Sequence, residues 1–382
     1  MRLPRSGRAL VLALVCICAT VAGGAVRVIQ DSCGPFTDVS VLLCPYVLEA
    51  FYTGITVGTS ATTFSPDVPI TRGQAAVFTI KGLNQSLARG SRRAALGQWW
   101  TTSDFYGVNG TPLGSYPGLP ACDGTDVWVP VRPESVARVR GSDGQILATW
   151  SGVTGTRAAL VAMGFVFVMG DDASRGEDLY VIDPRLPAGP ISPIRSHLLS
   201  SGQMTFDGAK LWTVNSDGTL SNFGAGNGFG ENVVPGSVGG QFIFFDGKNL
   251  WAPSRDDTSL LRLDLNGNVL QTVSVSASQV AFDGANLWLT SVGGNSVSIV
   301  QASTGTVLTV LTGNGMTSPY FVAFDGRRMM VSSVFAPYAA SLWDAASLEA
   351  LGSVNFAGNG GVCSDGLNFW IARQGYNDLA RF

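Results

Sequence analysis

The sequence predicts a mainly β protein in which a seven-bladed β-propeller follows a small α-helical module. Two observations predict the propeller: an Asp-Gly turn followed by an aromatic strand recurs with a period near 40 residues, and the segments between turns are short and rich in β-branched residues. Such a period with only short β-like runs is typical of four-stranded propeller blades. A third observation predicts the module, because apolar residues before position 85 follow helical spacing instead.

The repeat unit is best seen in the segment FDGANLW, which begins at residue 282. Six copies keep the Asp-Gly pair, five of them place Trp five residues after the Asp, and a degenerate copy stands at 163–164. We expect Gly to accept a positive φ in each turn, and the large ring to wedge between neighbouring sheets. The repeat residues are Asp123, Gly124, Trp128, Asp207, Gly208, Trp212, Asp246, Gly247, Trp251, Asp283, Gly284, Trp288, Asp325, Gly326, Asp365, Gly366 and Trp370.

Seven units of this length need roughly 280 residues, which assigns the propeller to residues 100–382. The last unit ends at Phe382, one strand short of a complete blade. We therefore expect the segment 99–116 to supply the missing strand and close the ring. Closure would remove exposed sheet edges, which are otherwise sites of aggregation.

The first 25 residues have the features of a secretory signal peptide. Arg2, Arg5 and Arg8 precede an apolar run over 9–22, which ends in small residues. The run is short for a transmembrane helix, so we expect cleavage after Ala25 and no membrane span afterwards. An uncleaved membrane anchor is the alternative.

Residues 26–85 form the predicted helical module, and residues 86–99, which contain a small basic cluster, form the predicted linker. Apolar residues at helical spacing predict a helix within 41–52. A second helix should begin at Thr71, with Gln74 three residues later as its capping-box partner.

Four motifs in this module resemble the S-layer homology family. They are FTDV at 36–39, GITVG at 54–58, FSPD at 64–67 and ITRGQ at 70–74. The resemblance implies attachment to the bacterial cell envelope through wall polysaccharide, with Asp38, Arg72 and Gln74 as candidate ligand-binding residues. Such modules usually act in threes, and only one is found here. The alternative is that these side chains only cap and brace the helices.

The cysteine count suggests two disulfides in the mature chain. Cys16 and Cys18 would leave with the signal peptide, so four cysteines remain, an even number in an exported protein. Cys33 could pair with Cys44. Cys122 and Cys363 hold nearly equivalent positions in the first and last blades, and their bridge would lock the ring. Buried free thiols are the alternative.

The composition excludes several classes of site. The formal net charge is −3 and only 13% of residues are charged, which argues against nucleic-acid binding. His197 is the single histidine, so we expect no metal centre and no cofactor. The acidic pairs at 171–172, 177–178 and 256–257 are assigned to turns, and the alternative is that they act on sugars or bind calcium. The glycine-rich stretch 224–230 lacks a phosphate-loop signature and is assigned to a flexible loop.

The repeats also resemble the broad propeller families with YVTN- or NHL-type units, which implies no particular activity. We expect an exported, non-catalytic protein of the cell surface or envelope whose propeller binds an unknown protein or glycan. Two alternatives remain. The first is a propeller enzyme, either a hydrolase or a lyase, since the repeats are similar to those of streptogramin-lyase-like propellers, which would imply an axial histidine. The second is a structural surface-layer component.

Overall fold

The computed structural model describes residues 33, 35–40, 43–52, 55–89, 110–172, 176–240, 242–256, 258–355 and 360–382. It divides into two compact units, Met1–Thr101 and Thr102–Phe382. The expected signal peptide, its cleavage site and most of the expected linker lie outside the described residues.

The first unit contains helix α2 (Cys44–Tyr52), within the range predicted for the first helix, and helix α3 (Arg72–Arg89), which begins directly after Thr71. Cys33, Phe36 and Val47 form a small buried core, and the Phe36 and Phe51 rings meet edge to face at 5.2 Å. A disulfide joins Cys33 to Cys44. Residues 86–89, expected in the linker, are the last residues of α3.

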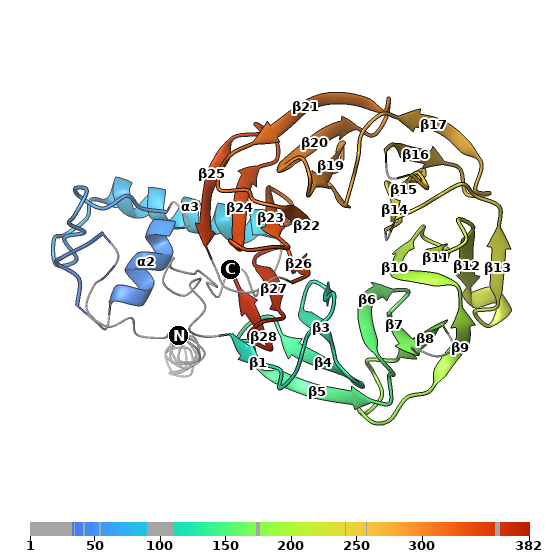
Figure 1. The fold of residues 1–382 in the computed structure, drawn as a ribbon. Helices are drawn as coiled ribbons and strands as arrows, with labels where there is room; N and C mark the ends of the chain where they lie inside the picture. The colour runs from blue at the N-terminus through green and yellow to red at the C-terminus, as the bar shows by residue number, and fades with distance from the viewer. Residues whose placement is uncertain are drawn as a thin grey trace, which may run out of the picture. The chain divides into compact units, whose positions relative to one another are not determined.

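The second unit is a ring of seven four-stranded antiparallel sheets (Figure 1), which confirms the predicted propeller. In each sheet the first strand is innermost and the fourth lies at the rim. The first three sheets comprise β2 (Ala121–Cys122), β3 (Asp126–Val131), β4 (Ser135–Arg140), β5 (Ile146–Ser151); β6 (Thr156–Ala162), β7 (Phe165–Asp172), β8 (Gly176–Ile182), β9 (Pro193–Leu198); β10 (Ser200–Phe206), β11 (Lys210–Asn215), β12 (Leu220–Gly224) and β13 (Glu231–Val234). The next three comprise β14 (Phe244–Phe245), β15 (Leu250–Pro253), β16 (Leu260–Leu263), β17 (Val269–Val273); β18 (Gln279–Phe282), β19 (Asn286–Ser291), β20 (Ser296–Gln301), β21 (Thr306–Thr312); β22 (Pro319–Phe324), β23 (Arg328–Ser333), β24 (Ala339–Asp344) and β25 (Ala350–Asn355).

The seventh sheet combines both ends of the propeller. It contains β26 (Val362–Ser364), β27 (Phe369–Arg373), β28 (Asp378–Arg381) and, as its outermost strand, β1 (Thr111–Pro112). Thr111 pairs with Leu379 and Pro112 with Asp378. The segment 99–116 therefore supplies the missing strand, as predicted.

The repeated tryptophans pack between neighbouring sheets, as the sequence predicts. Trp212 on β11 is fully buried among side chains that include Leu250 and Leu263 of the next sheet. Trp370 of the last sheet packs in the same way against Val127 and Val129 of the first. The core of the propeller is thus a set of apolar layers between sheets, and each ring fills one layer.

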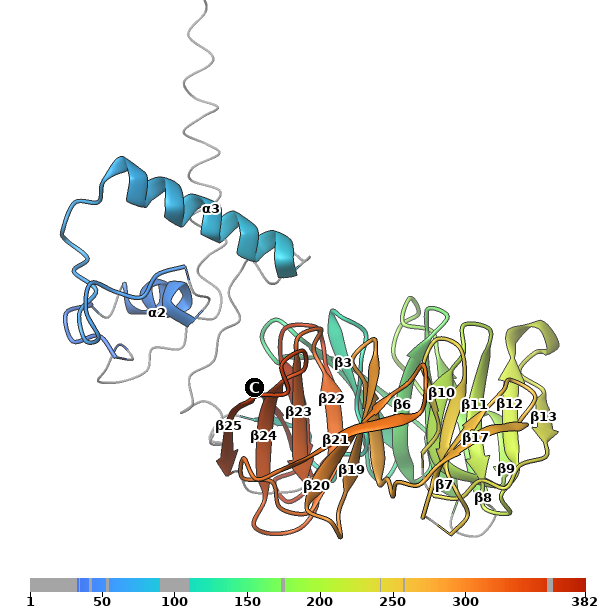
Figure 2. The same cartoon turned by 90° about the horizontal axis from the view of Figure 1, so that it is seen from above.

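The strands run between two faces of the ring (Figure 2). One face carries the Asp-Gly turns that join first and second strands. We call the opposite face the entry face, because the first strand of every sheet begins there. It also carries the turns between second and third strands, such as 132–134 and 374–377.

Candidate functional sites

Asp38, a predicted ligand-binding residue, is engaged in bracing its own unit. Its Oδ1 accepts the N–H of Phe64 at 2.8 Å and its Oδ2 accepts the N–H of Ser65 at 2.7 Å. The hydrogen bond from the Phe64 N–H is the main reason why the pKa of Asp38 is lowered, with a smaller contribution from Ser65. Both carboxylate oxygens therefore hold the 64–67 loop against the segment before α2.

The start of α3 forms the predicted capping box. The Thr71 N–H donates to Gln74 Oε1 at 2.8 Å, and the Gln74 N–H donates to Thr71 Oγ1 at 3.2 Å. Arg72, the first residue of α3, is exposed. Within the described part of the chain no hydrogen bond or ion pair engages its guanidinium. Of the three predicted residues, Arg72 keeps its whole polar group available to a ligand, whereas Asp38 uses both carboxylate oxygens and Gln74 uses its Oε1 in local hydrogen bonds.

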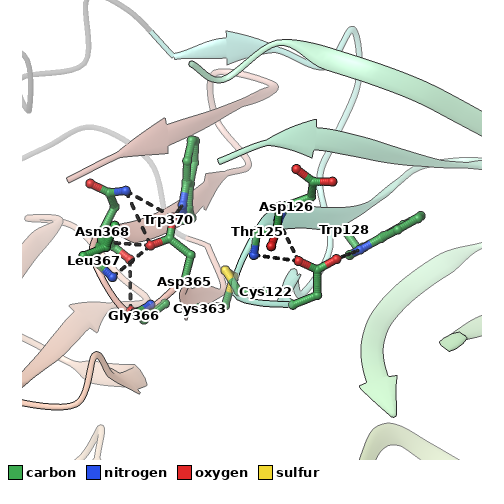
Figure 3. Close-up of a disulfide and its surroundings, with 12 residues drawn as sticks. Cys122, Thr125, Asp126, Trp128, Cys363, Asp365, Gly366, Leu367, Asn368 and Trp370 are labelled. Atoms are coloured by element: carbon green, nitrogen blue, oxygen red, sulfur yellow. Dashed lines mark hydrogen bonds between the residues drawn. A yellow bond between two sulfur atoms is a disulfide. The ribbon is translucent and has the colours of Figure 1, made fainter. Parts of the chain in front are cut away.

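The Asp-Gly repeat builds a clamp in five of the seven sheets. In each, Asp Oδ1 accepts the backbone N–H groups two and three residues later, while Oδ2 accepts the Nε1–H of the Trp five residues later at 2.7–2.9 Å (Figure 3 shows two). In the sixth sheet Met330 stands at the position of the Trp, and the Arg328 Nε–H donates to Asp325 Oδ2 instead. These residues serve the scaffold.

A disulfide joins Cys122 on β2 to Cys363 on β26, the innermost strands of the first and last sheets (Figure 3). Their Cα atoms lie 5.8 Å apart across a sequence separation of 241 residues. The structure thus contains the predicted bridge and not the alternative of two free thiols.

An arginine between two carboxylates lies on the entry face of the second sheet. Asp171 on β7 stands opposite Glu177 on β8, and Arg157 on β6 reaches both. Its Nη2 is 2.5 Å from Asp171 Oδ2 and its Nη1 is 3.0 Å from Glu177 Oε1. The assignment of the pairs 171–172 and 177–178 to turns was wrong, because they end and begin the two strands of one hairpin and so face each other.

Glu177 is the most perturbed carboxyl of this cluster. Its pKa is raised to about 7, chiefly because burial disfavours the charged form, while Arg157 lowers it and Asp171 raises it. Its Oε2 and the Thr156 Oγ1 are buried without a hydrogen-bond partner among the described residues. A carboxyl that titrates near neutrality beside an arginine is a candidate functional group.

Comparisons with known proteins separate the two units. Residues 35–76 match the S-layer homology domain family. The propeller is similar to the WD40 β-propeller domain of Doa1, with TM-score 0.54 and 14% identity over 71% of this chain and 93% of that one. It is also similar to hydrazine synthase of Kuenenia stuttgartiensis, with TM-score 0.55 and 15% identity over 72% and 97%. These likenesses show the fold alone. No curated protein matches the chain.

The matched S-layer homology domain contains all three residues predicted to bind wall polymer. They come from two places, Asp38 before α2 and Arg72 with Gln74 at the start of α3. The structure gives Asp38 and Gln74 local roles in bracing and capping. None of the described helices is long and apolar enough to cross a membrane.

The single histidine and the acidic pair at 256–257 do not join Arg157, Asp171 and Glu177 in a common site. His197 is exposed at the end of β9, the rim strand of the second sheet, and its backbone N–H donates to Asp178 Oδ1 at 3.2 Å. Asp256 accepts from Ser254 Oγ in a local turn, as expected, and Asp257 lies outside the described residues. Among described side chains, no group of three or more His, Cys, Asp or Glu is placed to hold a metal.

The glycine-rich stretch was expected to be a flexible loop. It is a compact connection between β12 and β13, with a short 3-10 turn, Ala225–Asn227. Phe229 packs against Phe167, with ring centroids 5.3 Å apart, and Arg195 Nη2 donates to the Gly228 carbonyl. Local packing accounts for this segment.

Sequence reasoning missed Arg157, which organises the acidic cluster. Arg157 lies 14 and 20 residues before its two partners, and no motif marks it. The sequence did contain a partial signal for the cluster. The acidic pairs 171–172 and 177–178 are close enough in sequence to meet across a tight hairpin.

Proposed function

We propose that the protein is exported and attached to the cell envelope, with its propeller acting as a non-catalytic binding platform. In this proposal residues 1–25 direct export and are removed, and residues 26–85 form an S-layer-homology-like helical module that binds envelope polysaccharide. The match of residues 35–76 to the S-layer homology domain family is the observation that carries it.

Arg72 is the residue that we assign to the polymer. Its guanidinium is exposed and unengaged within the described residues, and it presents a rigid fork of donors suited to acidic sugar groups. It also stands in the first turn of an 18-residue helix, where the helix dipole favours an anion. An acidic wall polymer therefore fits this position better than a neutral one.

Co-sedimentation of the full mature chain with purified cell envelopes tests the proposal. Arg72→Ala should reduce the bound fraction severely, and Arg72→Lys should restore it only in part, because lysine keeps the charge without the fork. Arg327→Ala is the matched control. It removes the same charge from an exposed propeller arginine, whose Nε lies 3.7 Å from Asp344. Equal sedimentation of wild type and Arg72→Ala would refute the assignment.

The non-catalytic part of the proposal rests on the position of His197. The lyase-like alternative expects a histidine on the propeller axis, whereas His197 stands on a rim strand. The S-layer component alternative predicts ordered self-assembly, and electron microscopy of the concentrated mature chain distinguishes it from a dispersed platform.

A further inference from the structure

The exposed aromatic residues of the propeller gather on one face. Among its described residues, three aromatic side chains are more than a third exposed: Tyr116 at 41%, Phe335 at 60% and Tyr376 at 53%. All three lie on the entry face, in the turns after β23 and β27 and in the segment that leads into β2. The Asp-Gly face has none among the described residues. Exposed rings confined to one face mark a binding surface.

Two of these rings lie where the seventh and first sheets meet, and both have contacts with residues at or beside the turn 374–377. Tyr116 donates its hydroxyl to Gln374 Oε1, and the Arg132 guanidinium lies 5.6 Å from the Tyr116 ring centre. Tyr376, in the same turn as Gln374, rests on the buried Arg373, whose guanidinium is 4.9 Å from the ring centre. The seventh and first sheets thus share a continuous polar and aromatic surface.

This surface continues to the Arg157 cluster on the second sheet. Arg132 Nε donates to the Thr156 carbonyl at 3.3 Å, and Thr156 precedes Arg157 on β6. Contacts between residues that are the same or near neighbours in the chain therefore lead across three adjacent sheets. We call this set the entry-face band; its members are Tyr376, Gln374, Tyr116, Arg132 and Arg157.

The charges of the band decide its ligand class. Arg157 is matched by Asp171 and Glu177, which leaves Arg132 as the one cation without a carboxylate among the band's contacts. A polyanion needs several unmatched cations. Side chains with both apolar faces and hydrogen-bonding groups instead suit a ligand that alternates C–H and hydroxyl surfaces.

We infer that the entry-face band binds a neutral glycan chain, with Tyr376 and Tyr116 as stacking platforms and Gln374, Arg132 and Arg157 as hydrogen-bonding groups. The inference deepens the proposed function, on which it rests, by naming the ligand class of the propeller. It also assigns the two units different partners, an acidic polymer at Arg72 and a neutral glycan on the propeller.

The test is binding of the full mature chain to immobilised neutral oligosaccharides of the gluco-, manno-, galacto- and N-acetylhexosamine series, beside an acidic polyuronate series. Wild type should bind at least one neutral series. Tyr376→Ala should weaken that binding by about tenfold, as removal of a central ring contact does, and Tyr376→Phe should retain it. Tyr46→Ala, which removes a tyrosine of similar exposure from the other unit, is the control.

Failure of this inference is distinguishable from failure of the proposed function. No binding to any neutral series, or binding that Tyr376→Ala leaves unchanged, overturns the band. If Arg72→Ala abolishes array binding, the glycan belongs to the S-layer homology domain, so the band is refuted while envelope attachment stands. Matching thermal unfolding of all variants excludes misfolding as the cause.

Discussion

At the scale of single residues, Glu177 shows how a strand pairing creates chemistry that composition hides. It is 5% exposed, and the charged groups around it come from three strands: Arg157 on β6, Asp171 on β7 and Asp178 beside it on β8. The fourth strand, β9, contributes His197, whose side chain is exposed. One arginine shared between two carboxylates only partly offsets the cost of burying a charge, and so the pKa of Glu177 rises.

The raised pKa predicts a pH-dependent contribution to stability. The folded-state pKa of Glu177, about 7, exceeds its ordinary value of 4.5, so the folded state holds this proton more tightly than the unfolded state. The contribution is greatest below about pH 4.5 and is lost as pH rises towards 7, by up to about 3 kcal/mol in unfolding free energy. In Glu177→Gln this contribution should be absent.

Urea unfolding of wild type and Glu177→Gln between these pH values provides the measurement. Other carboxyls affect both proteins alike, so the difference between the two curves isolates Glu177. Parallel curves across the range would mean that Glu177 titrates normally in the folded protein.

At the scale of elements, the Asp-Gly turn and its strand could be predicted because they are local. Asp283 and Trp288 are five residues apart, and this constant spacing is enough to place the Asp carboxylate within hydrogen-bonding distance of the Trp ring. The partners of Arg157 could not be predicted, because they depend on the register between three strands. The same limit applies to Gln374, which meets Tyr116 across a sequence separation of 258 residues only because the propeller closes into a ring.

The rim strands show a second local device that sequence reasoning did not single out. In four sheets the fourth strand carries an extra residue opposite the third strand, and that residue is leucine each time. The bulged residues are Leu147, Leu270, Leu308 and Leu351, which are all exposed. Bulges disrupt the regular edge of a strand, so this repeated irregularity protects the open rim from pairing with other chains.

The clamp predicts that an Asp→Asn substitution lowers the unfolding free energy by different amounts in two blades. Asp283→Asn places an amide N–H against the buried Trp288 Nε1–H, which then lacks an acceptor, and should cost about 1–3 kcal/mol of unfolding free energy. Asp325→Asn should cost less, below about 1 kcal/mol, because its partner Arg328 is partly exposed and can turn to water. Thermal unfolding of both variants checks this, and equal losses would show that the backbone bonds of the turn, not the Trp bond, carry the energy.

At the scale of the whole molecule, ring closure depends on contacts between residues far apart in the chain. The pairing of β1 with β28 is short, only Thr111 and Pro112. A buried ion pair between Arg373 and Asp378 stands beside it, and the Cys122–Cys363 disulfide joins the innermost strands. The incomplete last repeat let the sequence predict closure, because a missing strand must come from the other end of the propeller.

The two disulfides should contribute unequally to stability. In the chain-entropy model a bridge across 241 residues is worth about 5 kcal/mol, and one across 11 residues about 3 kcal/mol. Cys122→Ala/Cys363→Ala should therefore lower the unfolding temperature of the propeller markedly. Cys33→Ala/Cys44→Ala should leave that transition unchanged, since both cysteines lie in the other unit. Calorimetry of the two double variants, with mass spectrometry after alkylation to count free thiols, measures both effects. If the propeller unfolds at the same temperature without the Cys122–Cys363 bridge, the β1–β28 pairing and the Arg373–Asp378 pair suffice to hold the ring closed.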